Sequence, residues 1–147
     1  MSLHAVDDDR PDRYVELVEA SSSLQEIGRI PLKPGNARAV FERAVAGMAV
    51  ELVFPRAVLA YMVAVAPELA TAAVERGTLV LLVHDDPPGG FAIFDECVGT
   101  CCRDYETGLS RAILDTDTPE AREHARSVYD AYRRDATPFD VTALVAS

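Results

Sequence analysis

Basic side chains are scarce in this sequence. The 147 residues include 14 lysines and arginines against 24 acids, and the formal net charge is −10. Lys33 is the only lysine, and the densest basic pair, Arg133-Arg134, is flanked by Asp130 and Asp135. Nucleic-acid binding needs basic side chains that replace the counterions of the phosphates. We therefore expect that this chain does not bind DNA unaided.

The lack of lysine also indicates the solvent to which the protein is adapted. Carboxylates hold water and repel one another, so a surface rich in acids and poor in lysine suits concentrated salt. The sequence also lacks a signal peptide, and its longest apolar run, residues 57–66, is too short to cross a bilayer. These absences predict a halophilic, cytoplasmic protein with no membrane partner.

The length of the chain suits one domain with a core of its own. Met1-Ser2-Leu3 resembles a start added for expression, followed by a domain taken from a longer protein. We assign residues 1–11 to this start and an acidic lead-in. Residues 12–147 then form a single domain.

The first half of the sequence has the pattern of an α/β fold. Apolar periodicity predicts helices over residues 12–20, 35–46 and 56–76. Apolar runs predict strands over residues 24–30, 48–54 and 78–83. Pro67 is expected to kink or split the longest helix, because proline cannot continue the backbone hydrogen bonding. Strand, helix and strand at this spacing predict βαβ units with parallel pairing and right-handed crossovers.

The second half of the sequence has short apolar segments separated by short turns. It predicts three antiparallel strands over residues 91–94, 99–105 and 109–114, joined by short turns. Asp117 and Thr118 can cap a final helix that has Pro119 at its first position. The tail from Thr137 is expected to be a short strand or a disordered end. The fold class is therefore α/β: βαβ units followed by an antiparallel meander, with helices on both faces of the sheet.

Four segments of this pattern resemble a known archaeal domain. They are GMAVELVFP, ERGTLVLLVHDDPPGGFAIFDE, DYETG and ILDTDTPEAREHARSVYDAYR, between Gly47 and Arg134. In this order they resemble the middle domain of methanogenesis-regulator-type winged-helix transcription regulators, as a haloarchaeal member. The strand VGTCCR departs from the family, where small apolar residues are expected.

The resemblance implies a ligand-sensing or dimer-forming module of a homodimeric regulator. DNA would then be bound only through an N-terminal winged helix that this chain lacks. The resemblance also implies an architecture like one half of a phospholipase-D-type fold, without its chemistry. No cofactor is expected.

His84 is the first residue to weigh for catalysis. Phospholipase-D-like enzymes use a histidine nucleophile with a lysine two residues later, but here Asp86 holds that place and would repel a phosphate. We therefore expect no enzyme activity. His84, Asp85 and Asp86 could instead bind a metal if Glu51 or Asp95 converged on them, or they could be a solvated junction between a strand and a turn.

A third interpretation is a small-molecule pocket, because βαβ sheets bind ligands beyond the carboxyl ends of their strands. Arg56 follows one buried strand and His84 the next, and Arg29 to Lys33 follow the first strand. Arginine and lysine suit a carboxylate or phosphate group, and histidine can change its charge near neutral pH. The candidate ligand-binding residues are Arg29, Lys33, Arg56 and His84, and the effector is unknown.

The three cysteines, Cys97, Cys101 and Cys102, leave two interpretations open. Their odd number and the missing signal peptide indicate reduced thiols. Side chains alternate along a strand, so Cys101 and Cys102 are expected to face opposite sides and not to chelate one ion. We expect structural cysteines, with a metal- or redox-sensing site as the alternative.

Overall fold

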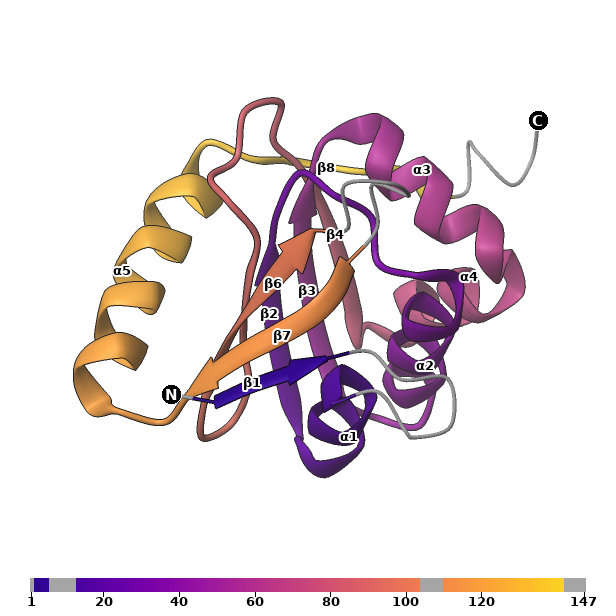
Figure 1. The fold of residues 1–147 in the computed structure, drawn as a ribbon. Coiled ribbons are helices and arrows are strands. Elements are labelled where there is room, and N and C mark those ends of the chain that lie inside the picture. Colours follow the sequence, from indigo (N-terminus) through magenta and orange to yellow (C-terminus); the bar gives the residue numbers. More distant parts are fainter. Residues whose placement is uncertain (1, 6–12, 104–109, 142–147) are drawn as a thin grey trace.

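The computed structural model describes residues 2–5, 13–103 and 110–141, which form an eight-stranded mixed sheet covered by helices (Figure 1). The strands are β1 (Ser2–Ala5), β2 (Ser23–Ile27), β3 (Ala49–Phe54), β4 (Leu79–Val83), β5 (Phe91–Ile93), β6 (Val98–Arg103), β7 (Ser110–Thr116) and β8 (Thr137–Pro138). The helices are α1 (Arg13–Ala20), α2 (Pro34–Val45), α3 (Arg56–Val65), α4 (Pro67–Arg76) and α5 (Pro119–Arg134). The strand order is β1-β7-β6-β5-β2-β3-β4-β8.

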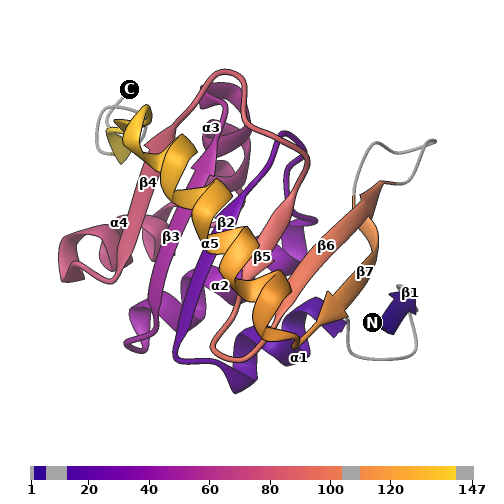
Figure 2. The ribbon, with the colours of Figure 1, turned by 90° about the vertical axis from the view of Figure 1, so that its left-hand side faces the viewer.

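The central strands are parallel, which confirms the predicted βαβ units. β3 lies between β2 and β4 and pairs in parallel with both. Because side chains alternate along a strand, Val50, Leu52 and Phe54 enter the larger core, whereas Val53 enters the smaller one. The larger core lies beneath α1 to α4, and α5 covers the opposite face (Figure 2). The helices therefore lie on both faces, as predicted.

The predicted meander is also confirmed. β5, β6 and β7 pair antiparallel in sequence order, and β5 joins the meander to β2. One strand, β1, was not predicted. Residues 1–11 were expected to be a lead-in, but β1 pairs antiparallel with β7. Its four residues, SLHA, are too short a segment to show a strand period. The expected turn at residues 106–108 lies outside the described residues.

β2 ends at Ile27, earlier than predicted, where the backbone passes close to the segment before β5. The N–H of Gly28 still donates to the carbonyl of Val53 at 3.2 Å. A Cβ at Gly28 would lie 3.2 Å from the Cα of Gly90 and 3.2 Å from Cε1 of Phe54. Glycine therefore allows this close approach, and the chain turns away after it.

Pro67 divides the predicted long helix into α3 and α4, which meet at 107°. Proline lacks the N–H that would continue the helix, and its ring clashes with the preceding turn. Both helices bury residues in the larger core. Among the described residues no single helix is long and apolar enough to span a membrane. The bent α3–α4 pair has the required length and apolar composition only when its two helices are counted together.

One hydrogen bond caps the start of α5, and two hold the helix against the sheet. At its start, the Oγ1 of Thr118 accepts a hydrogen bond from the N–H of Ala121 at 3.3 Å, which confirms the predicted cap. Further along, the hydroxyl of Tyr129 donates to Oε1 of Glu51 at 2.5 Å, and Nε of Arg133 donates to the same oxygen at 2.7 Å. The acid inside β3 is therefore paired beneath α5, where Tyr129 is fully buried.

Candidate functional site

The carboxyl ends of β3 and β4 lie side by side at one edge of the sheet. The N–H of His84 donates to the carbonyl of Phe54 at 3.1 Å, and Arg56 begins α3 just after β3. Together they form a pocket of about 350 Å³, which we name the sheet-edge pocket. It is lined by Arg56, Val83, His84, Asp85, Asp86, Asp135 and Thr137. The structure thus brings two of the four candidate ligand-binding residues to one pocket.

Both of these side chains contact aromatic rings at the C-terminal end of the chain. The guanidinium of Arg56 lies 5.9 Å from the ring centre of Phe139. The ring of His84 meets the ring of Tyr132 edge to face at 5.1 Å, and its Nδ1 accepts a hydrogen bond from the N–H of Asp86 at 3.0 Å. The pocket therefore joins the end of β4 to the end of α5.

Arg29 and Lys33 do not line this pocket, so the expected group of four is only half assembled. The Nη2 of Arg29 is 2.7 Å from Oδ1 of Asp86, and its Nε donates to the carbonyl of Pro87 at 2.5 Å. Lys33 is instead the N-cap of α2, where its carbonyl accepts the N–H of Ala37. Arg29 therefore stays next to the pocket through Asp86, whereas Lys33 belongs to the start of α2.

The metal site considered for His84 requires Glu51 or Asp95, and the structure brings neither to it. Glu51 faces α5, where it is already paired. Asp95 accepts hydrogen bonds from Ser22 and Ser23 at the start of β2, which is the opposite edge of the sheet. Within the described ranges, no group of three or more histidine, cysteine and acidic residues is placed to hold a metal ion.

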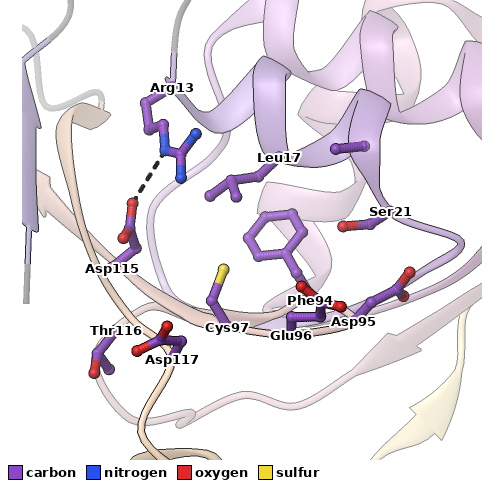
Figure 3. A pocket seen from close by; sticks show the side chains of 11 residues that line it. Arg13, Leu17, Ser21, Phe94, Asp95, Glu96, Cys97, Asp115, Thr116 and Asp117 are labelled. Carbon is purple, nitrogen blue, oxygen red and sulfur yellow. Dashed lines mark hydrogen bonds and ion pairs between the residues drawn. The ribbon is translucent and has the colours of Figure 1, made fainter.

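A second cavity, of about 420 Å³, lies between α1, the turn after β5 and the end of β7 (Figure 3). We name it the α1 cavity. It is lined by Arg13, Leu17, Ala20, Ser21, Phe94, Asp95, Glu96, Cys97, Asp115, Thr116 and Asp117. Sequence reasoning missed it because its walls come from three segments far apart in the chain. No local motif marks such a cavity.

Polar contacts of Arg13 and Asp95 join the segments that line the α1 cavity. Nε of Arg13 donates to Oδ2 of Asp115 at 3.1 Å and so joins α1 to β7 (Figure 3). Asp95 accepts four hydrogen bonds, from the backbone and hydroxyl groups of Ser22 and Ser23, at 2.8 to 3.0 Å. These bonds, above all the one from the Ser22 backbone, hold the pKa of Asp95 below its usual value. The charged carboxylate of Asp95 therefore holds the start of β2 to the turn after β5.

Cys97 contributes a thiol to the α1 cavity. Burial, followed by the charge of Asp115, raises the pKa of this thiol, so it is a weaker nucleophile and metal ligand than an ordinary cysteine. Cys101 and Cys102 occupy consecutive positions of β6, but their side chains lie outside the part of the structure that is described. The structural interpretation of the three cysteines stays a prediction.

Solved structures share this fold at low sequence identity. Nuc, a phospholipase D family member from Salmonella typhimurium, matches with a TM-score of 0.68 and 15% identity, covering 94% of this chain and 97% of that one. NucT from Helicobacter pylori matches with a TM-score of 0.65 and 15% identity, covering 94% and 98%. The mixed sheet is therefore of the phospholipase D type.

TrmBL2, an archaeal chromatin protein with a novel mode of DNA binding, matches with a TM-score of 0.61 and 12% identity. The match covers 86% of this chain and 49% of TrmBL2, so this chain spans about half the length of that protein. A search of curated proteins found no match.

The family model for the middle domain of the methanogenesis regulatory protein FilR1 matches residues 8–135, which is most of the chain. That range contains every helix and strand from α1 to α5, the whole lining of the α1 cavity, and the lining of the sheet-edge pocket except Thr137. The sequence segments that resembled the regulator domain also lie inside it. This chain therefore belongs to the FilR1 middle-domain family of archaeal regulators.

Proposed function

We propose that this chain is the effector-sensing or dimer-forming domain of a transcription regulator, with effector sensing as the role favoured here, and that it catalyses no reaction. Membership of the FilR1 family supports the regulatory role. The net charge of −10 disfavours direct contact with DNA phosphates, which supports DNA binding through a winged helix outside this chain. TrmBL2, which this fold matches over about half of its length, is an archaeal chromatin protein that binds DNA.

The observation that carries the proposal is that Arg56 and His84 line one pocket at the carboxyl ends of β3 and β4. This edge is where open α/β sheets bind their ligands. Arg56 suits an anionic group of the effector, whereas Asp85 and Asp135 accept hydrogen bonds from its hydroxyl or amino groups. Because three aspartates and one arginine line the pocket, the effector class is a polar metabolite that carries amino or hydroxyl groups beside one anionic group for Arg56.

The pocket also suggests how effector binding changes the conformation of the domain. Its walls come from the start of α3, the end of β4 and the segment after α5. An effector that fits one relative position of these elements stabilises it and shifts the population towards it. In a homodimer this shift would alter the spacing of two recognition helices on DNA.

We expect a matching metabolite to raise the thermal midpoint of the domain in concentrated salt. A ligand at about a hundred times its dissociation constant adds about 2.7 kcal/mol to the stability of the folded state. Arg56→Ala and His84→Ala should each remove most of the shift. Arg38→Ala, at an exposed position on α2, should retain it.

Two outcomes would contradict this proposal in different ways. If no metabolite raises the midpoint while the isolated domain stays dimeric across dilution, the domain is a dimerisation module without an effector. If the protein instead turns over a phosphodiester and His84→Ala abolishes the turnover, it is an enzyme of the phospholipase D type.

The acidic composition predicts stability that rises with salt, as expected for a halophilic protein. At a net charge of −10 the folded chain repels itself, and salt weakens this repulsion as the Debye length falls from about 10 Å at 0.1 M to about 3 Å at 1 M. We expect the urea midpoint to rise over this range of potassium chloride. A midpoint that is unchanged by potassium chloride but raised by sucrose would show that charge repulsion is not the cause.

A further inference from the structure

Glu26 is a buried carboxyl group that the proposed effector site does not use. It lies in β2, and its residue is only 3% exposed. Its neighbours in register are Leu52 of β3 and Ala92 of β5, both of which are apolar. A charged carboxylate at such a position has no water to solvate it, so the ionised form is costly.

The partner of Glu26 is Tyr14 of α1. The Tyr14 hydroxyl donates to Oε1 of Glu26 at 2.5 Å, and the tyrosine is itself buried. The ring of Tyr14 also meets the ring of Phe94 edge to face, with centroids 5.9 Å apart. Phe94 lines the α1 cavity, as do Arg13 and Leu17 from the same helix. The contact with Glu26 therefore holds the helix that forms one wall of this cavity.

No charge next to Glu26 compensates its ionisation in the described part of the chain. Burial, opposed in part by the Tyr14 hydrogen bond, raises its pKa from 4.5 to about 7, and no charged group contributes to the shift. Of the titratable residues of α1, Tyr14 is the one that is buried, and the buried residues of α2, on the same side of the sheet, carry no charge. Protonation of Glu26 is therefore set by burial and by the position of α1.

We propose that Tyr14 and Glu26 form a proton-sensitive latch that docks α1 on the sheet and so controls the width of the α1 cavity. In the protonated form the carboxyl group stays buried and accepts the Tyr14 hydrogen bond. When it loses its proton to solvent, the carboxylate needs water. Water reaches it when α1 moves away from β2, and this movement opens the wall of the cavity. The latch does not depend on an effector in the sheet-edge pocket.

Hydrogen exchange of the α1 amides across neutral pH tests the latch on the whole chain without any ligand. With a pKa of about 7 when α1 is docked and about 4.5 when it is open, the opening equilibrium should increase about tenfold from pH 6 to pH 8, after correction for intrinsic exchange. Glu26→Gln should show no such increase. Glu19→Gln, at an exposed position of the same helix, should behave like the wild type.

A second variant keeps the proposal testable if Glu26→Gln does not fold. Tyr14→Phe retains the ring contact with Phe94 but removes the hydroxyl, whose hydrogen bond lowers the pKa of Glu26. Carboxyl-carbon NMR should therefore show Glu26 titrating at higher pH in this variant, and the rise in α1 exchange should move with it. Titration of Glu26 near pH 4.5, or α1 exchange that is as pH-dependent in Glu26→Gln as in the wild type, would overturn the latch.

Discussion

Replacing Tyr129 with alanine is expected to lower the free energy of unfolding by about 3–5 kcal/mol, as for other large aromatic side chains removed from a core. Tyr129 is fully buried, and it packs beneath α5 against the smaller core, which includes Val53. Its hydroxyl also bonds to Glu51. The substitution therefore leaves a cavity and removes one of the two hydrogen bonds that the structure shows to this carboxylate, which Arg133 then holds alone. Urea denaturation in concentrated salt measures the change.

Two comparisons separate packing from hydrogen bonding in this prediction. Tyr129→Phe retains the ring and loses only the hydroxyl, so its cost should be about 1.5–3 kcal/mol, as for a bond to a charged group. Tyr61→Ala removes the same side chain from a position that is 45% exposed, and it should cost little. If Tyr129→Ala and Tyr61→Ala unfold at the same urea concentration, α5 does not contribute to the core in the way the structure indicates.

Glu26 is expected to make the stability of the whole domain fall as pH rises towards neutrality. Its pKa is about 7 in the folded state against 4.5 ordinarily, so between these values the folded state binds more protons than the unfolded state. Its contribution is therefore fully present below about pH 4.5 and lost as pH rises through about 7, a change on the order of 3 kcal/mol. The measurement is the free energy of unfolding from urea titrations across this range.

The difference between the wild type and Glu26→Gln isolates this contribution. Asp95 acts in the opposite direction, because its lowered pKa gives stability that is lost as pH falls. It is present in both proteins and cancels in the comparison. The advantage of the wild type over Glu26→Gln should therefore shrink as pH rises. A difference that does not vary with pH would show that Glu26 is solvated in the folded state.

The order and type of most elements could be predicted from the sequence, because local physics decides them. The segments that form β3 and β4 are mostly apolar on both faces, as in a strand covered on both sides. Proline interrupts a helix in any context, and so Pro67 does here. Thr118 and Pro119 are residue types that favour the start of a helix. β1 could not be predicted, because its four residues become a strand only by pairing with β7.

The sheet-edge pocket was likewise predicted only in part. The position of Arg56 and His84 at one edge followed from the sequence, since parallel strands end at the same edge of a sheet. The pairing of Arg29 with Asp86 and Pro87, outside the pocket lining, did not follow from the sequence, because it is a contact between distant segments.

The sequence by itself determined the strand and helix pattern, the charge and the family of this protein, since these depend on residue type and local order. Tertiary structure alone decided which side chains meet. Tyr14 and Glu26 are both ordinary residues in the sequence, and their pairing depends on how α1 packs on the sheet. Arg13 and Asp115 are 102 positions apart, and they meet because β7 returns beside α1. Burial and partners of this kind are set by contacts between distant segments, and so the pKa of Glu26 is a property of the fold.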